Sequence, residues 1–200
     1  MKSMTVNPTE ILNQNLVHFA QLSEEDIDLA KRFWTHRTIP KNEFFNFRNS
    51  VCRHVGFIVK GLFRVYYVDL NTEIEHNIFF VAENTFMVSL KSFLTQTACP
   101  YNIEALEDSE LLVISHEHLQ SLYPQSHAWE RFGRILAEQY FIYSQSKSEA
   151  MMSQSAEERY VALINNFPDI ANRVSLGHIA SYLGIKGPSL SRIRAQIAGK

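Results

Sequence analysis

The sequence predicts an α+β chain with an N-terminal jelly-roll β-barrel, a long connecting helix and a C-terminal all-α domain. Three observations predict this fold class. Short segments rich in β-branched and aromatic residues lie between about Thr38 and Ser115, which is typical of strands. A helical repeat of apolar residues then runs from about Ser126 to Met152. Beyond it, the spacing of small and apolar residues over 174–194 favours two helices that cross at a tight turn.

The composition is that of an ordinary globular protein. The 200 residues are 46% hydrophobic and 20% charged, which allows one or two domains with a sizeable core. Because the N-terminus lacks the apolar core of a signal peptide and no run of about 20 apolar residues follows, we expect a cytoplasmic protein that engages no membrane. The two cysteines, Cys52 and Cys99, support neither a disulfide framework nor a cysteine-ligated zinc or iron–sulfur site. We therefore expect no metal and no cofactor.

Asn7 to Thr35 is predicted to be helical. Ser23 is followed by three acidic residues, which is a typical helix start because acids favour the positive end of the helix dipole. The apolar residues that follow are spaced to form one buried face. We interpret this face as packing and not as a ligand site.

The strand-like segments share short length, β-branched or aromatic composition and flanking turn residues. Gly61 and the segment Asp69–Glu73 are expected to form hairpin turns. Short strands at such close spacing favour a jelly-roll or cupin-like barrel. The predicted strands are Phe44–Arg48, His54–Gly61, Leu62–Asp69, Glu73–Phe80, Tyr101–Ala105 and Leu111–Ile114.

An apolar stripe follows the long helix at three- or four-residue steps. Such a stripe is either intrachain core or a coiled-coil-like dimer seam. We favour the seam, because the helix links a sensor-like barrel to the C-terminal domain. The stripe consists of Trp129, Phe132, Leu136, Tyr140 and Tyr143.

Ser155 and Glu158 form a capping box that starts the next helix, and Pro168 stops that helix soon after Phe167. The predicted division is therefore a barrel domain with N-terminal helices over 1–125, a dimerisation helix over 126–154 and a C-terminal domain over 155–200.

The stretch 174–194 carries the local signals of a helix-turn-helix. Ser175 can cap the first helix, and Gly184 can end it in the left-handed conformation. Pro188 fits the first turn of the second helix, where its missing N–H leaves no bond unmade. Leu190, Ile193 and Ile197 then form the buried stripe.

The opposite face of the second helix carries hydroxyl and guanidinium groups from Ser189, Ser191, Arg192 and Arg194, which can reach phosphates and guanine edges. The range 155–200 has six Lys or Arg against three Asp or Glu, whereas 1–154 has 13 against 18. The alternative is a two-helix corner with a solvated basic face. The charge placement favours double-stranded DNA as a partner.

Two stretches carry a family resemblance: SAEERYVALINNFPDIANRVSLGHIASYLGIKGPSLSRIR at the C-terminus and SFLTQTACPYNIEALEDSELLVI in the barrel. They resemble the Crp/Fnr family of bacterial transcription regulators, especially those of Bacteroidetes-like bacteria. The resemblance implies a cyclic-nucleotide-binding-like barrel and a homodimer on a palindromic operator, with recognition helices in successive major grooves. It also allows RNA polymerase as a further partner.

The barrel departs from family members that bind cyclic nucleotides. Val88 and Ser89 stand where those members have Gly-Glu, and Cys99 and Pro100 stand where they have Arg-Ser. A cyclic phosphodiester must be desolvated, so a pocket without the guanidinium is not expected to bind cAMP or cGMP. The effector is then an unknown small molecule or none, and the eight histidines leave haem open. The residues assigned to this degenerate effector pocket are Phe86, Val88, Ser89, Leu90, Cys99, Pro100 and Tyr101.

The DNA-reading set is also only partly matched. Of the family's Arg-Glu-x-x-x-Arg pattern, Arg192 alone is present, and Gly187 and Pro188 take the first two positions. We expect a different operator half-site and no wing after the recognition helix, with Lys200 adding charge. The candidate DNA-binding residues are Ser175, Gly177, Lys186, Gly187, Pro188, Ser189, Ser191, Arg192 and Arg194.

Two other function classes fit the sequence less well than a regulator. A cyclic-nucleotide or other small-molecule effector module without operator-specific DNA binding would lack the charged ligand contacts named above. A cupin-like metal enzyme would need paired histidines facing into the barrel, but His116 and His118 follow the last predicted strand. We expect a protein that is not an enzyme.

Overall fold

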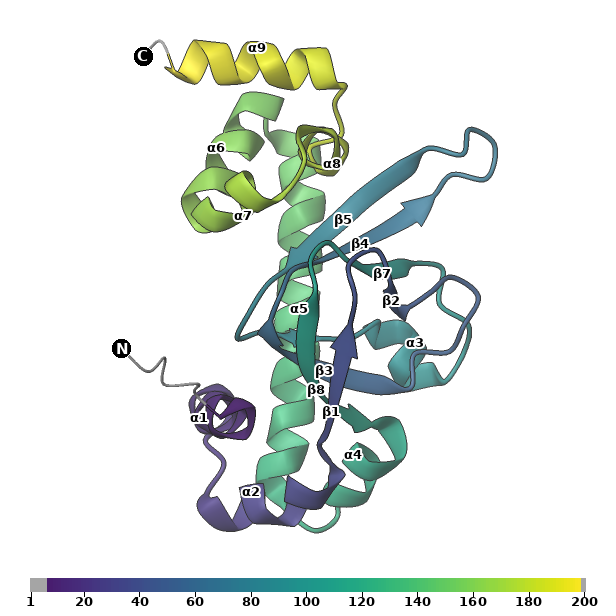
Figure 1. Ribbon diagram of the computed structural model, residues 1–200, viewed down its shortest axis with the longest axis vertical. Coiled ribbons are helices and arrows are strands. Elements are labelled where there is room, and N and C mark those ends of the chain that lie inside the picture. The colour runs from purple at the N-terminus through teal and green to yellow at the C-terminus, as the bar shows by residue number, and fades with distance from the viewer. Residues whose placement is uncertain (1–6, 199–200) are drawn as a thin grey trace.

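The computed structural model describes residues 7–198, so Lys200 lies outside the described residues. A β-sandwich lies in the middle of the molecule, with helices at both of its ends. The long helix His127–Ser153 runs along the sandwich from one group of helices to the other (Figure 1). Among the described residues, none of the helices combines the length and the hydropathy that a membrane span requires.

The segment predicted to be helical, Asn7–Thr35, contains more than one helix, and the helix start predicted at Ser23 is confirmed. It comprises α1 (Pro8–Ala20), α2 (Glu24–Ala30) and a 3₁₀ turn, Lys31–Phe33. Gln21 ends α1 in the left-handed conformation, with φ 53°. The capping box of Ser23 and Asp26 starts α2 as predicted. Thr35 belongs to the first strand and not to a helix.

The sandwich consists of two four-stranded antiparallel sheets with the orders β1-β8-β3-β6 and β2-β7-β4-β5. The six predicted strands are confirmed, with ends shifted by up to two residues. Two further strands, β1 and β6, were missed, because β1 is mostly exposed and β6 has only two residues. The strands are β1 (Thr35–Ile39), β2 (Phe44–Asn46), β3 (His54–Lys60), β4 (Phe63–Val68), β5 (Glu75–Val81), β6 (Phe86–Met87), β7 (Asn102–Ala105) and β8 (Ser109–Ser115).

Two short helices accompany the strands: α3 (Leu90–Thr95) lies between β6 and β7, and α4 (His116–Leu122) follows β8. Gly61 turns the chain between β3 and β4 with φ 114°, and a Cβ there would lie 2.1 Å from the Ser109 hydroxyl oxygen. The turn therefore requires glycine on both conformational and steric grounds.

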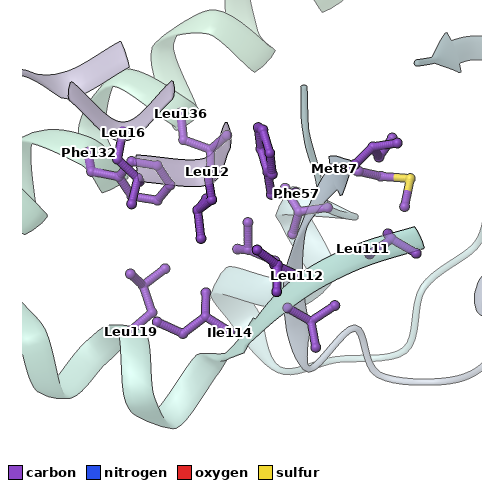
Figure 2. Packing of buried hydrophobic residues seen from close by; sticks show 14 of the residues in the cluster. Leu12, Leu16, Phe57, Met87, Leu111, Leu112, Ile114, Leu119, Phe132 and Leu136 are labelled. Carbon is purple, nitrogen blue, oxygen red and sulfur yellow. The ribbon is translucent and has the colours of Figure 1, made fainter. Parts of the chain in front are cut away.

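The main core contains buried residues of both sheets and of the helices that cover the first sheet. Leu12 and Leu16 of α1 pack with Phe57, Leu112 and other residues of the sheet (Figure 2). Burial of these apolar side chains is the main source of stability for this end of the molecule.

The long helix α5 (His127–Ser153) has 27 residues and so spans about 40 Å. Trp129 and Phe132 are fully buried, and Leu136 is nearly so, all within the core of their own chain. The favoured dimer-seam interpretation is therefore wrong for these three residues, because α1 and the sandwich already cover them. Tyr140 and Tyr143 are half-buried and contact Phe79 of β5.

The C-terminal helices are α6 (Ala156–Asn166), α7 (Pro168–Arg173), α8 (Leu176–Tyr182) and α9 (Gly187–Ala198). The capping box of Ser155 and Glu158 is formed, and Pro168 begins α7 directly after α6 ends. These helices share a second core, which also contains Leu62 and Phe80 of the sandwich. The second core therefore joins the C-terminal helices to the second sheet.

Candidate functional site

The turn between α8 and α9 has the conformation that the sequence predicts. The Ser175 hydroxyl accepts a hydrogen bond from the His178 N–H and caps α8. Gly184 has φ 69°, and the Ile185 N–H donates to the Ala180 carbonyl at 3.0 Å. This is a Schellman ending, which needs a left-handed residue at that position. Pro188 lies in the first turn of α9, so the helix-turn-helix is formed.

The candidate DNA-binding residues all lie on α8, on α9 or in the turn between them. Eight of the nine are exposed, Gly177 included, and α9 lies at the outer end of the molecule (Figure 1). Ser189 is half-buried and Ser191 is exposed. Neither Arg192 nor Arg194 forms an ion pair with a described residue, so both guanidinium groups are available to a ligand outside the chain. Their contact with DNA stays a prediction.

The first helix of this motif covers the edge of the second sheet. The Ser181 hydroxyl donates to the Glu75 carbonyl at 2.7 Å and accepts from the Asn77 N–H at 3.0 Å. The Asn77 side-chain amide donates to the His178 carbonyl. Because β5 is an edge strand, these bonds satisfy backbone groups that would otherwise remain unpaired. The helix-turn-helix is thus held directly on the sandwich.

A buried arginine stands beneath this contact. The Arg64 guanidinium donates to the Glu104 carboxylate at 2.6 and 3.0 Å and to Glu75 at 2.5 Å. It also lies 3.2 Å from His178 Nδ1. Since arginine can only donate, this ring nitrogen is the acceptor. Burial and the nearby Arg64 charge lower the pKa of His178, which keeps the imidazole neutral.

A second ion-pair cluster joins α7 to the sandwich. Arg173 bonds to both carboxylate oxygens of Glu83, at 2.8 and 2.9 Å, and to both of Glu107, at 2.6 and 2.9 Å. Burial alone would raise the pKa of Glu83, but its bonds from Arg173 and the Gly61 N–H bring that pKa down to about 2. The two carboxylates are therefore ionised at neutral pH, and the same contacts raise the pKa of Arg173.

A cavity of about 450 Å³ lies between β5, β6, α5 and α7. It contains four of the residues assigned to the degenerate effector pocket: Phe86, Val88, Ser89 and Tyr101. The assignment is wrong for Leu90, Cys99 and Pro100, which do not line it. The Cys99 sulfur is buried and lies 2.9 Å from the hydroxyl oxygen of Ser89, which lines the cavity. The thiol therefore lies behind the lining residues and not in the cavity. Pro100 is exposed at the surface, and Leu90 packs on the main core.

The cavity wall is apolar and carries no cation. Of the eighteen described residues that line it, eleven are aliphatic, phenylalanine or methionine, and none is lysine, arginine or histidine. Its one ionised group is Glu83, which Arg173 already pairs. Sequence reasoning missed the wall residues of β5, α5 and α7, among them Phe79, Gln139, Phe167 and Ile170, because no local motif marks residues that come together only in the fold.

The described residues hold no cluster of three His, Cys, Asp or Glu side chains that could bind a metal ion. None of the eight histidines, all of which are described, lines the cavity. His116 contacts the ring of Phe93, and His118 stacks on Phe33 at 4.4 Å. These rings take part in packing, and the cavity offers no imidazole as an axial ligand to haem.

Comparisons with known proteins bear on the fold. Residues 36–126 match the family described as cyclic nucleotide-binding domain. FixK2 from Bradyrhizobium japonicum superimposes with a TM-score of 0.71 at 14% identity, over 83% of this chain and 85% of that one. The c-di-GMP-responsive regulator CLP of Xanthomonas campestris also gives 0.71 at 14% identity, over 88% and 92%. A protein from Eubacterium rectale assigned to the Crp/Fnr family gives 0.70 at 17% identity, over 89% and 85%. A search of curated protein sequences returns no significant match.

Proposed function

We propose that this chain, which combines a cyclic nucleotide-binding domain with the fold of Crp/Fnr-type regulators, is a DNA-binding transcription regulator of that type. It acts as a homodimer on a palindromic operator. Its effector pocket does not bind cAMP, because a phosphodiester would enter an apolar cavity in which no described residue supplies a positive charge.

The observation that carries the proposal is the exposed basic surface around α9. Arg192 lies opposite the buried Leu190 and Ile193. Arg194, two residues further on, points to another side of the helix, and neither arginine has an ion-pair partner among the described residues. Lys186 is exposed in the turn before α9. A recognition helix needs such a surface, since guanidinium groups reach guanine edges and cations reach phosphates. Leu190 of α9 is buried in the second core and holds this helix in place.

In vitro selection of bound sequences from random duplex DNA tests the proposal. Enrichment of a palindromic motif by the full chain is the expected result, since a two-fold symmetric dimer presents two copies of α9. The selection is run with and without a cell-metabolite extract, which separates ligand-gated from constitutive binding. Failure to enrich any sequence in both arms would count against operator-specific binding.

Replacing Arg192 with alanine is expected to weaken binding to the selected operator and relax the preference at one base pair. A bidentate arginine–guanine contact accounts for roughly 1–3 kcal/mol of discrimination. Arg194→Ala is the matched control, because the loss of a phosphate contact weakens all sequences about equally and lowers the salt dependence. Competition binding with operators changed at single positions measures both. Unchanged selectivity in Arg192→Ala would mean that α9 is not the reading helix.

The dimer contact is proposed on the exposed face of α5, in place of the buried stripe. Phe141 is 66% exposed and Met152 is 81% exposed, and Gln145 and Ser148 lie between them on the surface. These positions follow one another at steps of four, three and four residues, which is the spacing of a two-helix seam. Ile142, which is also exposed, flanks the seam.

Phe141→Asp is expected to convert the dimer into a folded monomer. In a two-fold dimer the substitution removes two buried phenyl groups, each contributing about 1.5–3 kcal/mol, so the dissociation constant should rise ~100-fold or more. Sedimentation velocity over a range of protein concentrations measures this. Leu70→Asp, at the exposed tip of the β4–β5 hairpin, is the control and should leave the dimer intact. A Phe141→Asp variant that stays dimeric would place the seam elsewhere.

A further inference from the structure

The cavity has the size and shape of a small-molecule site. Its volume of about 450 Å³ falls within the ~300–1,000 Å³ usual for ligand pockets. Its walls come from three parts of the chain: the sandwich, α5, and α7 of the C-terminal helices. A ligand in it would contact all three at once.

The polar groups of the wall are mostly occupied within the protein. Glu83 is bonded to Arg173 and to the Gly61 N–H. The hydroxyls of Ser89 and Tyr143 have the Cys99 sulfur and the Tyr182 hydroxyl as partners. These groups are therefore not available to recognise a charged or strongly polar ligand, which would lose its hydration without replacement.

The wall nevertheless offers a small number of free hydrogen-bonding groups. The Tyr140 hydroxyl and the Gln139 amide have no side-chain hydrogen bond to a described residue, and both lie on α5. Burial raises the pKa of Tyr140 to about 12, so its hydroxyl remains a neutral donor. One or two such groups amid apolar walls orient a ligand without requiring it to carry charge.

We propose that this cavity binds an uncharged, largely apolar and aromatic molecule that hydrogen-bonds to Tyr140 and rests against Ile170 of α7 and against Phe167, which directly precedes that helix. The aromatic preference follows from the rings of Phe79, Phe86 and Tyr140, which provide edges and faces for another ring. Because α7 forms part of the wall, the ligand favours the arrangement in which the C-terminal helices rest on the sandwich. The inference deepens the effector role proposed above and rests on it.

The test compares two fluorescent probes with the same aromatic skeleton. N-phenyl-1-naphthylamine is neutral, whereas 8-anilinonaphthalene-1-sulfonate carries an anionic group. Titration of the full chain should show saturable binding of the neutral probe, one molecule per protomer, at least ~10-fold tighter than the sulfonate because the anion must be desolvated. Excess cAMP should not displace it. Equal or tighter binding of the sulfonate, or displacement by cAMP, would overturn the proposal.

Phe167→Ala tests whether the junction of α6 and α7 belongs to the site. Phe167 is partly exposed, so its replacement should leave the chain folded and weaken the neutral probe ~5- to 10-fold. Phe47→Ala, which removes an exposed ring outside the cavity, is the control and should not change the binding. Probe binding that responds to Phe47 and not to Phe167 would refute the site. Since the titration contains no DNA, a failure of operator selection would count against the regulator and leave the cavity result standing.

Discussion

Replacing Arg64 with methionine is expected to lower the free energy of unfolding by about 3–5 kcal/mol, because it leaves a buried carboxylate without its partner. Arg64 is 5% exposed and Glu104 is 8% exposed. Without the guanidinium, Glu104 remains in a site that water reaches poorly, and its charge is no longer compensated. The contact of His178 with Arg64 is lost as well, so α8 should detach more readily from β5. Urea unfolding at neutral pH measures the loss.

Two further variants identify the cause of that loss. Arg134→Met breaks an exposed ion pair with Glu138 on α5 and should cost no more than about 0.5 kcal/mol. Arg64→Met combined with Glu104→Gln removes both charges and should recover a large part of the stability, since a buried pair replaced as a whole is often neutral. An Arg64→Met variant as stable as Arg134→Met would show that the buried pair contributes nothing.

The parts of the fold that the sequence predicted correctly are those that local chemistry specifies. Ser23, Ser155 and Ser175 start helices because each hydroxyl accepts a bond from an N–H three residues ahead. Gly184 ends α8 because the Schellman ending needs a left-handed residue. In contrast, β1 carries no alternating pattern, as Ile39 is its only buried residue. Its pairing with β8 depends on tertiary contacts that a local pattern does not record.

The candidate site also has a part that local sequence specifies and a part that depends on tertiary contacts. The candidate DNA-binding residues lie close together in the sequence, along α8, α9 and the turn between them, so a local motif was enough to group them. The cavity combines β5, β6, α5 and α7, which are up to about 90 residues apart, and no short motif identifies it. Transfer by resemblance placed Cys99 in the pocket, but its sulfur instead bonds within the protein. The Arg173 cluster gave no local signal either, since its two acidic partners lie in separate loops.

Trp129→Ala is expected to destabilise the protomer by about 3–5 kcal/mol. The variant tests whether the α5 stripe is core of its own chain or a dimer seam. The indole is fully buried, packs against Phe132 with ring centroids 5.4 Å apart, and donates its N–H to the Asp26 carbonyl at 2.8 Å. Truncation to alanine leaves a cavity lined by side chains that collapse only partly. It also leaves the Asp26 carbonyl without that donor.

The dependence of this effect on protein concentration separates core from seam. Because the indole contacts only its own chain, the loss in unfolding free energy should be the same in dilute and concentrated samples, as measured by urea unfolding. The side chain of a seam residue is buried only in the dimer, so the effect of its replacement would vanish on dilution. Sedimentation of Trp129→Ala under native conditions should therefore show the same oligomeric state as the parent chain, whereas Phe141→Asp should dissociate the proposed dimer. A folded, monomeric Trp129→Ala would restore the seam to the buried stripe.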